Sequence, residues 1–136
     1  MSELIQGGGF VDQRGKLLYN NELNLGDVKR MYIVENKDTN IVRAWQAHKV
    51  EKRWFVAIDG ISEIRLVKID DFENPSDNLK VENFVLSAET LDCLYIQPGY
   101  ATSIQALSDN AKLAVFSNYM LGEINDDYKF DSDKWK

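Results

Sequence analysis

Short runs of β-branched and aromatic residues, separated by turn residues, make up most of this sequence. Apolar residues with helical spacing are scarce, and this pattern favours strands over helices. We expect strands at residues 16–20, 28–35, 40–49, 53–59, 62–69, 80–87, 93–97, 102–108 and 112–118. Pro75 and Pro98 fall between these runs, as expected because a proline removes a hydrogen bond from the ladder of a central strand. So many short strands predict an all-β sandwich or barrel.

Residues with turn chemistry occupy the breaks between the runs, at 25–27, 59–60, 74–78, 98–99 and 108–110. Glycine, proline, asparagine and aspartate are typical of such turns. At 59–60 an Asp-Gly pair supplies the positive φ angles that a tight turn needs. The stretch "AIDGIS" therefore predicts a β-hairpin.

Length and composition exclude several classes of protein. The 136 residues suit one domain, 1–136, with one hydrophobic core. The net charge of −6 argues against nucleic-acid binding, which begins with basic patches on phosphates. Cys93 is the single cysteine, which fits a reducing compartment. The N-terminus lacks the pattern of a signal peptide, and no apolar stretch approaches the ~18 residues of a membrane span. We expect a cytoplasmic protein that does not contact a membrane.

The C-terminal stretch 123–136 is acidic and aromatic. It is either a solvated tail or a segment that docks on the barrel through Tyr128, Phe130 and Trp135. The sequence leaves these two arrangements open.

The stretch "RAWQAHK" contains the single histidine, His48, in a predicted strand. Side chains alternate between the two faces of a strand. The alternation places Ala44, Gln46 and His48 on one face and Arg43, Trp45 and Ala47 on the other. On the next strand it places Arg53, Phe55 and Ala57 together. A face that carries both glutamine and histidine is polar, unlike an ordinary core.

This pattern resembles the cupin superfamily, small jelly-roll β-barrels. Their first motif, His-x-His followed by Glu and Gly, corresponds here to Gln46, His48, Arg53 and Gly60. Their second motif has Pro-Gly and then a histidine, and corresponds here to Pro98, Gly99 and Thr102. Of the usual metal ligands only His48 remains, and an arginine repels a divalent cation about as strongly as a glutamate attracts one. The resemblance therefore implies a single-domain cupin with neither a metal nor another cofactor.

Nearly the whole chain resembles RmlC-like cupins that act on nucleotide sugars. The stretch "GFVDQRGKL" is similar to the opening of dTDP-4-dehydrorhamnose 3,5-epimerases, and "LYIQPGYATSIQALSDNAKLAVFSN" is similar to their "YIPPG-x-AHGF" hairpin and the strand after it. The stretches "VKRMYIV" and "VRAWQAHK" resemble the "KR-x-Y" and "RG-x-HAHK" segments of the WxcM-like dTDP-4-keto-6-deoxyhexose 3,4-ketoisomerases. The order and spacing of these motifs imply a nucleotide-sugar substrate.

Two positions depart from these families. Both families have a histidine, the proposed catalytic base, at Gln46, and the epimerases have another at Thr102. Glutamine cannot exchange a proton near neutral pH, so the families' mechanism does not carry over intact.

Proton transfer beside the keto group of a 4-keto sugar needs a base, an acid on the opposite face and a donor for the enolate oxygen. His48 has the one side chain whose ordinary pKa fits the base, and it matches the second histidine of "HAHK", which the resemblance places in the active site. Tyr32, Tyr95 and Tyr100 are candidates for the acid, and Gln46 or Arg43 for holding a sugar oxygen. The alternative for His48 is a neutral residue that is hydrogen-bonded within a polar barrel.

The diphosphate of such a substrate needs cations. The candidates are Arg14, Arg43, Lys49 and Arg53, because guanidinium groups bind phosphate oxygens in pairs. The alternative is that these four side chains are ordinary exposed surface charges that bind no phosphate. We add Tyr95 and Gln97 as substrate-binding candidates near the Pro98–Gly99 turn.

Resemblance to the epimerases implies a homodimer in which the N-terminal strands cross to a second subunit and carry Arg14 into its site. The apolar side chains of Trp54, Val56 and Ile58 would then face another sheet or the partner. The alternative is that they belong to the core of one subunit.

The function that these features favour is a metal-independent epimerase or keto-isomerase of a nucleotide-linked 4-keto-6-deoxy sugar. The rival is a non-catalytic cupin that binds nucleotide sugars or carbohydrates, which the glutamine at position 46 would explain directly. A cupin with unrelated small-molecule chemistry at His48 is a third alternative.

Overall fold

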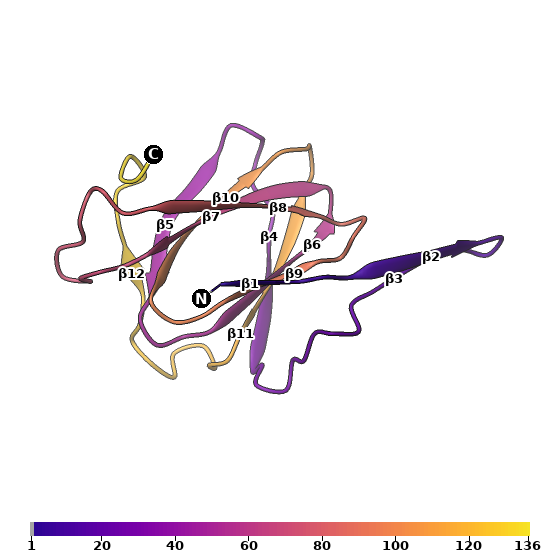
Figure 1. Ribbon diagram of the computed structural model, residues 1–136, viewed down its shortest axis with the longest axis horizontal. Helices are drawn as coiled ribbons and strands as arrows, with labels where there is room; N and C mark the ends of the chain where they lie inside the picture. Colours follow the sequence, from indigo (N-terminus) through magenta and orange to yellow (C-terminus); the bar gives the residue numbers. More distant parts are fainter. Residues whose placement is uncertain (1) are drawn as a thin grey trace.

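The computed structural model describes residues 2–136, and this range contains strands and turns but no helix. Two five-stranded antiparallel sheets face each other, and a two-stranded hairpin projects from them (Figure 1). The first sheet contains, in spatial order, β1 (Glu3–Ile5), β9 (Cys93–Ile96), β6 (Arg53–Asp59), β11 (Lys112–Ser117) and β4 (Arg30–Val34). The second contains β12 (Tyr128–Lys129), β5 (Val42–His48), β10 (Tyr100–Ala106), β7 (Ile61–Lys68) and β8 (Val81–Ser87). The hairpin consists of β2 (Gly8–Asp12) and β3 (Gly15–Tyr19).

From β4 to β7 the chain changes sheet at every connection, and it does so again from β8 to β12. This alternation is typical of a jelly roll, in which a strand pairs with partners distant in sequence. All nine predicted strands are present, with bounds that differ by at most two residues at either end.

The hairpin prediction for "AIDGIS" is wrong. Asp59 and Gly60 connect β6 and β7, which lie in different sheets, so the turn is a corner of the barrel. Gly60 has φ +69°, and a Cβ atom there would lie 2.4 Å from the Ser108 hydroxyl oxygen. The glycine is therefore needed for close packing as well as for the positive φ angle. The Pro98–Gly99 stretch is likewise a corner, between β9 and β10, and not a hairpin.

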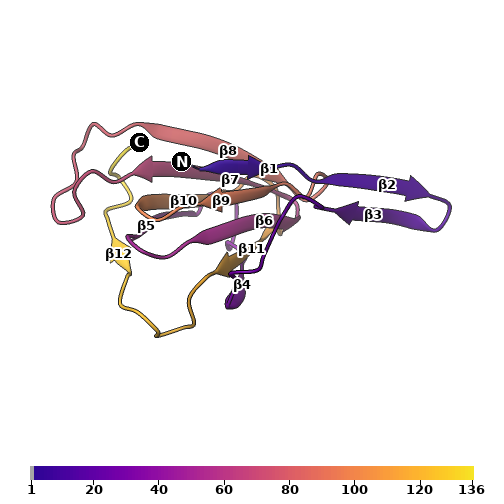
Figure 2. The same ribbon diagram turned by 60° about the horizontal axis from the view of Figure 1, so that its bottom comes forward.

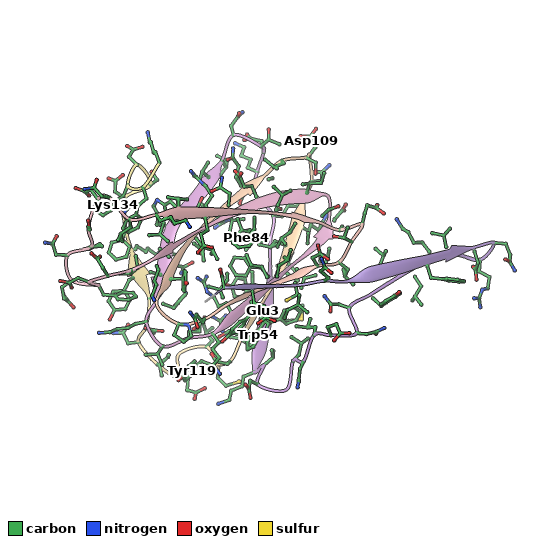
Figure 3. All side chains as sticks on the ribbon, viewed as in Figure 1. Glu3, Trp54, Phe84, Asp109, Tyr119 and Lys134 are labelled. Atoms are coloured by element: carbon green, nitrogen blue, oxygen red, sulfur yellow. The ribbon has the colours of Figure 1, made fainter. Side chains whose placement is uncertain are left out.

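The main hydrophobic core fills the space between the sheets. Alternate side chains of each strand enter it, as period-two patterning requires. Its fully buried members include Phe55, Leu94, Leu113 and Val115 from the first sheet and Ile64, Leu66 and Leu86 from the second. Phe84 packs against this cluster, and Figure 3 shows it among the side chains that fill the barrel.

The outer face of the first sheet carries a second cluster, with Trp54, Val56 and Cys93 at its centre. Ile5, Leu23 and Val28 of the same chain pack against it. Trp54 and Val56 are therefore covered by residues of their own chain, which is the alternative in which they belong to the core of one subunit. Ile58, the third residue of that group, remains 45% exposed.

The C-terminal segment docks on the outer face of the second sheet. β12 pairs with β5, and the backbone of Phe130 exchanges two hydrogen bonds with Trp45. The Trp135 ring packs edge-on against Trp45 with 5.5 Å between centroids, and its indole donates to the Ser76 carbonyl. The C-terminal segment is therefore docked on the barrel through its aromatic side chains and is not a solvated tail.

The β2–β3 hairpin extends away from the barrel, as two views show (Figures 1 and 2). Its apolar side chains Phe10, Val11 and Leu17 are 54%, 71% and 62% exposed. None of residues 2–136 forms a helix long and apolar enough to cross a membrane.

Candidate functional site

The barrel contains a cavity of about 360 Å³ between its two sheets, within the ~300–1,000 Å³ range of small-molecule sites. We call it the main cavity. Its lining residues are Tyr32, Val34, Arg43, Ala44, Trp45, Gln46, Arg53, Thr102, Ile104 and Lys129. Three of these side chains are cationic, and none is acidic. The main cavity is therefore suited to an anionic or carbonyl-bearing ligand.

Arg53 is the most deeply placed cation of the main cavity. It is only 2% exposed, and its guanidinium contacts the Thr102 hydroxyl at 3.3 Å and lies 5.2 Å from the Phe55 ring. Burial lowers the pKa of Arg53, and Tyr32 and Glu51 offset part of this effect. Arg53 forms no ion pair within 4.0 Å in the described range 2–136. A buried guanidinium without a paired carboxylate is costly, and a bound oxyanion would satisfy it.

Arg43 also lines the main cavity, because a β-bulge interrupts β5. Thr102 of β10 pairs with Gln46, but Ile104 pairs with Arg43, so two steps along β10 match three along β5. Paired residues in antiparallel strands point to the same face. Arg43 therefore lies on the same face as Gln46, and its predicted place beside Trp45 is wrong. The Arg43 Nε donates to the Asn36 side chain at 2.9 Å, which fixes its direction.

A second, smaller cavity of about 220 Å³ lies beside the first, and we call it the histidine chamber. Its lining residues are Arg30, Gln46, His48, Glu51, Met120, Leu121, Gly122, Ile124, Asp126 and Asp127. Gln46 lines both cavities. Its side chain donates to Asp127 Oδ1 at 2.9 Å, so this pair forms part of the wall between them.

His48 is 7% exposed, and its Nδ1 lies 2.7 Å from the backbone oxygen of Asp126. A carbonyl oxygen only accepts hydrogen bonds, so Nδ1 carries the hydrogen and Nε2 is the unprotonated nitrogen of the neutral ring. Burial lowers the pKa of His48, and the charge of Arg53 lowers it further. Glu51 and Asp126 act in the opposite direction. His48 is therefore a neutral imidazole near pH 7, the form that accepts a proton.

Asp126 fixes the turn after His48. Its carboxylate accepts hydrogen bonds from the backbone N–H groups of Lys49, Val50 and Glu51, at 2.8, 2.9 and 2.8 Å. One residue of the C-terminal segment thus orients both the histidine and the turn between β5 and β6.

The structure brings Tyr32, Arg43, Gln46 and Arg53 into the main cavity and His48 into the adjacent chamber. Tyr32 comes from the first sheet and His48 from the second, so they lie on opposite walls of the barrel.

The other candidates lie elsewhere. Tyr100 is in the hydrophobic core, where burial raises its pKa. Tyr95 packs on the outer face against Trp54, at 5.4 Å between centroids, because alternation turns Leu94 and Ile96 inward instead. Lys49 is exposed over the Phe72 ring, and Gln97 is half-buried away from both cavities.

Arg14 is at the tip of the projecting hairpin. Its side chain is 81% exposed, and the guanidinium pairs with Asp12 at 2.6 Å. Within one chain it therefore contributes to neither cavity.

Sequence reasoning missed Lys129, Glu51, Asp126 and Asp127. Lys129 and the two aspartates belong to a segment that reaches the site only through long-range docking. Glu51 follows His48 by three residues, and its place in the turn after a polar strand was the available signal.

Within residues 2–136, no group of three or more His, Cys, Asp or Glu side chains is arranged to hold a metal ion. At the cupin ligand positions, Gln46, Arg53 and Thr102 offer an amide, a cation and a hydroxyl. This donor set does not fit a transition metal.

Comparison with known proteins identifies the family. The model of the FdtA family, described as WxcM-like, C-terminal, matches residues 2–136. The chain belongs to this family. No curated protein matches the sequence.

Solved structures share the fold. A 3,4-ketoisomerase from Helicobacter canadensis is 20% identical with a TM-score of 0.66, and the match covers 98% of this chain and 87% of that one. A mutant of the 3,4-ketoisomerase QdtA from Thermoanaerobacterium thermosaccharolyticum, in complex with TDP-4-keto-6-deoxyglucose, is 21% identical with a TM-score of 0.67 over 98% and 84% of the chains. The rmlC epimerase of Mycobacterium tuberculosis is 14% identical with a TM-score of 0.76 over 96% and 69%. The WxcM-like chain thus has the jelly-roll fold of these proteins, the fold that its sequence predicts.

Proposed function

We propose that this WxcM-like protein is a metal-independent isomerase or epimerase of a nucleotide-linked 4-keto-6-deoxy sugar. The buried, unpaired Arg53 in the main cavity is the observation that carries the proposal. A guanidinium in that place is suited to an oxygen that gains negative charge, as the keto oxygen does when an enolate forms. The family, and the dTDP-sugar isomerases and epimerases of the same fold, support this substrate class.

The charges of the main cavity suggest how the substrate lies. Arg43 and Lys129 are exposed side chains that line it, whereas Arg53 is buried. We place the diphosphate against Arg43 and Lys129, where charge-assisted hydrogen bonds form with phosphate oxygens. The sugar ring then occupies the interior, with its keto oxygen toward Arg53.

Proton transfer needs groups on both faces of the sugar ring. His48 is the proposed base, because its Nε2 is unprotonated and its pKa is lowered by burial. Tyr32 is the proposed acid on the opposite wall of the barrel, in preference to Tyr100, which lies in the core. The sugar reaches His48 past Gln46, which lines both cavities and is suited to hold a sugar hydroxyl.

The deciding experiment is the incorporation of solvent deuterium beside the keto group of TDP-4-keto-6-deoxyglucose, followed by NMR. Wild-type protein should incorporate deuterium, and His48→Asn should do so at least about a hundredfold more slowly, the usual contribution of a general base. His48→Asn should still be stabilised thermally by the nucleotide sugar, since bound ligand stabilises the native state. Equal exchange rates in the two proteins would exclude His48 as the base.

A second candidate function is non-catalytic binding of a nucleotide sugar. It is favoured by the position of His48 in the smaller chamber and by glutamine at the site where the related enzymes are expected to have their base. Thermal stabilisation by nucleotide sugars, together with no exchange into any 4-keto sugar, would support this function over the enzymatic one.

We also propose that two copies of the chain form a dimer. The exposed apolar side chains of the β2–β3 hairpin, Phe10, Val11 and Leu17, are surface that a second copy would bury. In that dimer the hairpin would carry Arg14 toward the partner's main cavity. Sedimentation analysis tests the dimer, and a protein that sediments as a monomer would contradict the proposal.

The free Cys93 fits a reducing compartment, so we place the protein in the cytoplasm.

A further inference from the structure

The histidine chamber contains a buried carboxylate to which the proposed function assigns no role. Glu51 is 7% exposed, and its Oε2 atom has no hydrogen-bond partner within the described part of the chain. The same oxygen lies 4.0 Å from Nε2 of His48. Buried polar atoms are nearly always hydrogen-bonded, so an oxygen left without a partner beside a histidine points to a contact that forms during function.

The orientation of the His48 ring shows which nitrogen faces Glu51. The Asp126 carbonyl holds Nδ1–H, and the opposite nitrogen, Nε2, is turned toward Glu51. In the neutral ring Nε2 carries a lone pair, and a 4.0 Å separation leaves it free to accept a proton. Once protonated, the ring carries its positive charge next to a carboxylate oxygen that has no other partner.

We propose that Glu51 is a positioning residue for His48: its carboxylate faces the free Nε2 and stabilises the imidazolium that forms when this nitrogen accepts a proton. The inference rests on the proposed function of His48 as the base. In that step the C–H bond beside the keto group breaks, its electron pair forms the enolate, and an N–H bond forms at Nε2. Glu51 supplies the negative charge that the buried imidazolium needs.

Without Glu51 the surroundings of His48 oppose protonation. Burial and the charge of Arg53 both lower the pKa of His48, while Glu51 has the largest opposing effect. Arg53 and Glu51 lie close to His48 in sequence, so one short segment sets the balance. Six titratable or charged side chains surround His48. They are Glu51 of the turn after β5, Arg53 of β6, Asp126 and Asp127 of the C-terminal segment, Arg30 of β4 and Tyr100 of β10.

The chain has one histidine, so its ring signals in an NMR titration report His48 without assignment. Glu51→Gln keeps the size of the side chain and removes its charge, and it should lower the pKa of His48 by about one unit, a tenfold change in proton affinity. Glu51→Asp keeps the charge and should restore most of that difference. The control Glu73→Gln removes an exposed carboxylate from the loop after β7 and should leave the titration unchanged.

The outcome separates charge from packing. A packing role predicts that Glu51→Asp changes the titration as much as Glu51→Gln, and that result would overturn the proposal. So would an unchanged His48 pKa in Glu51→Gln. If the glutamine variant does not fold, wild-type protein with 13C-labelled carboxyl groups decides the matter. One glutamate carbon should follow the His48 midpoint, and the absence of such a signal would count against the pair.

The titration needs no substrate, so it is independent of the proposed enzymatic function. Where wild-type protein exchanges deuterium into the sugar, Glu51→Gln should also lower kcat about tenfold with little change in KM. A His48 pKa that moves as expected in a protein that exchanges no sugar proton would leave the His48–Glu51 pair standing and contradict the proposed reaction alone.

Discussion

Gln46 and Asp127 are joined by a hydrogen bond of 2.9 Å across the boundary between the two cavities. Gln46 belongs to β5, whereas Asp127 precedes β12 in the C-terminal segment. At position 46 the resemblance to sugar epimerases and ketoisomerases implies a basic histidine. Here an amide that cannot exchange protons contacts a carboxylate that accepts hydrogen bonds. The site therefore keeps an acceptor suited to an imidazole N–H, although the imidazole itself is replaced.

This pair predicts the effect of Gln46→His. Asp127 should accept the N–H of the new ring and leave its other nitrogen facing the main cavity as a second base. We expect deuterium exchange beside the keto group to rise about tenfold or more, since a positioned base contributes ~10²–10⁴-fold. The matched control is Gln97→His, at a half-buried position outside both cavities. An equal change in both variants would mean that the gain does not come from the site.

Arg43→Ala tests the proposed diphosphate contact. Thymidine diphosphate should raise the melting temperature of wild-type protein much more than thymidine does, because charge-assisted bonds to phosphate contribute ~1.5–3 kcal/mol. Arg43→Ala should lose most of this increase, whereas Lys49→Ala, on the exposed side near Phe72, should keep it. Stabilisation by thymidine as strong as by the diphosphate would show that the cationic side chains of the main cavity do not contact the diphosphate.

Elemental analysis tests metal independence. The amide, guanidinium and hydroxyl of Gln46, Arg53 and Thr102 stand at the metal-ligand positions of cupins. Protein purified without added metal should contain no stoichiometric zinc, iron or manganese, and a chelator should leave deuterium exchange unchanged. A metal present at one atom per chain would contradict this prediction.

His48 makes stability depend on pH. Its pKa in the fold is lowered from the usual 6.5, chiefly by burial, so the unfolded chain binds this proton more tightly. The contribution of His48 to the free energy of unfolding should therefore be constant above about pH 7 and should fall as the pH drops through 6.5 toward the folded value. Urea unfolding of wild type and His48→Asn over this range measures the effect. Parallel pH profiles would exclude His48 as its source.

Trp135→Ala tests the docking of the C-terminal segment. Trp135 is 5% exposed and packs against Trp45, and loss of a buried tryptophan costs ~3–5 kcal/mol. The same segment holds Asp126 against His48, so the tautomer of the ring should become mixed in NMR spectra. Leu121→Ala, at an 83% exposed position, should change stability by less than about 0.5 kcal/mol. Comparable losses in the two variants would argue against docking.

The sequence by itself determined the strands and most of their faces. Alternating side chains and turn residues are local properties, and for this reason Phe55 and Ala57 were correctly placed on the inner face with Arg53. The strands β1, β2 and β12 were not predicted. β1 and β12 have only three and two residues, too few to show a pattern, and β2 begins with two glycines, which are depleted in strands.

Only the tertiary structure decided which strands pair and which side chains meet. A jelly roll pairs strands that are distant in sequence, so Asp59–Gly60 became a corner rather than a hairpin. A bulge shifted Arg43 to the cavity face, because an extra residue in one strand depends on the register of its partner. The contacts of His48 with Asp126 and of Gln46 with Asp127 join residues about eighty positions apart. Local sequence patterns do not encode such pairs, because these contacts form only when the C-terminal segment docks on the barrel.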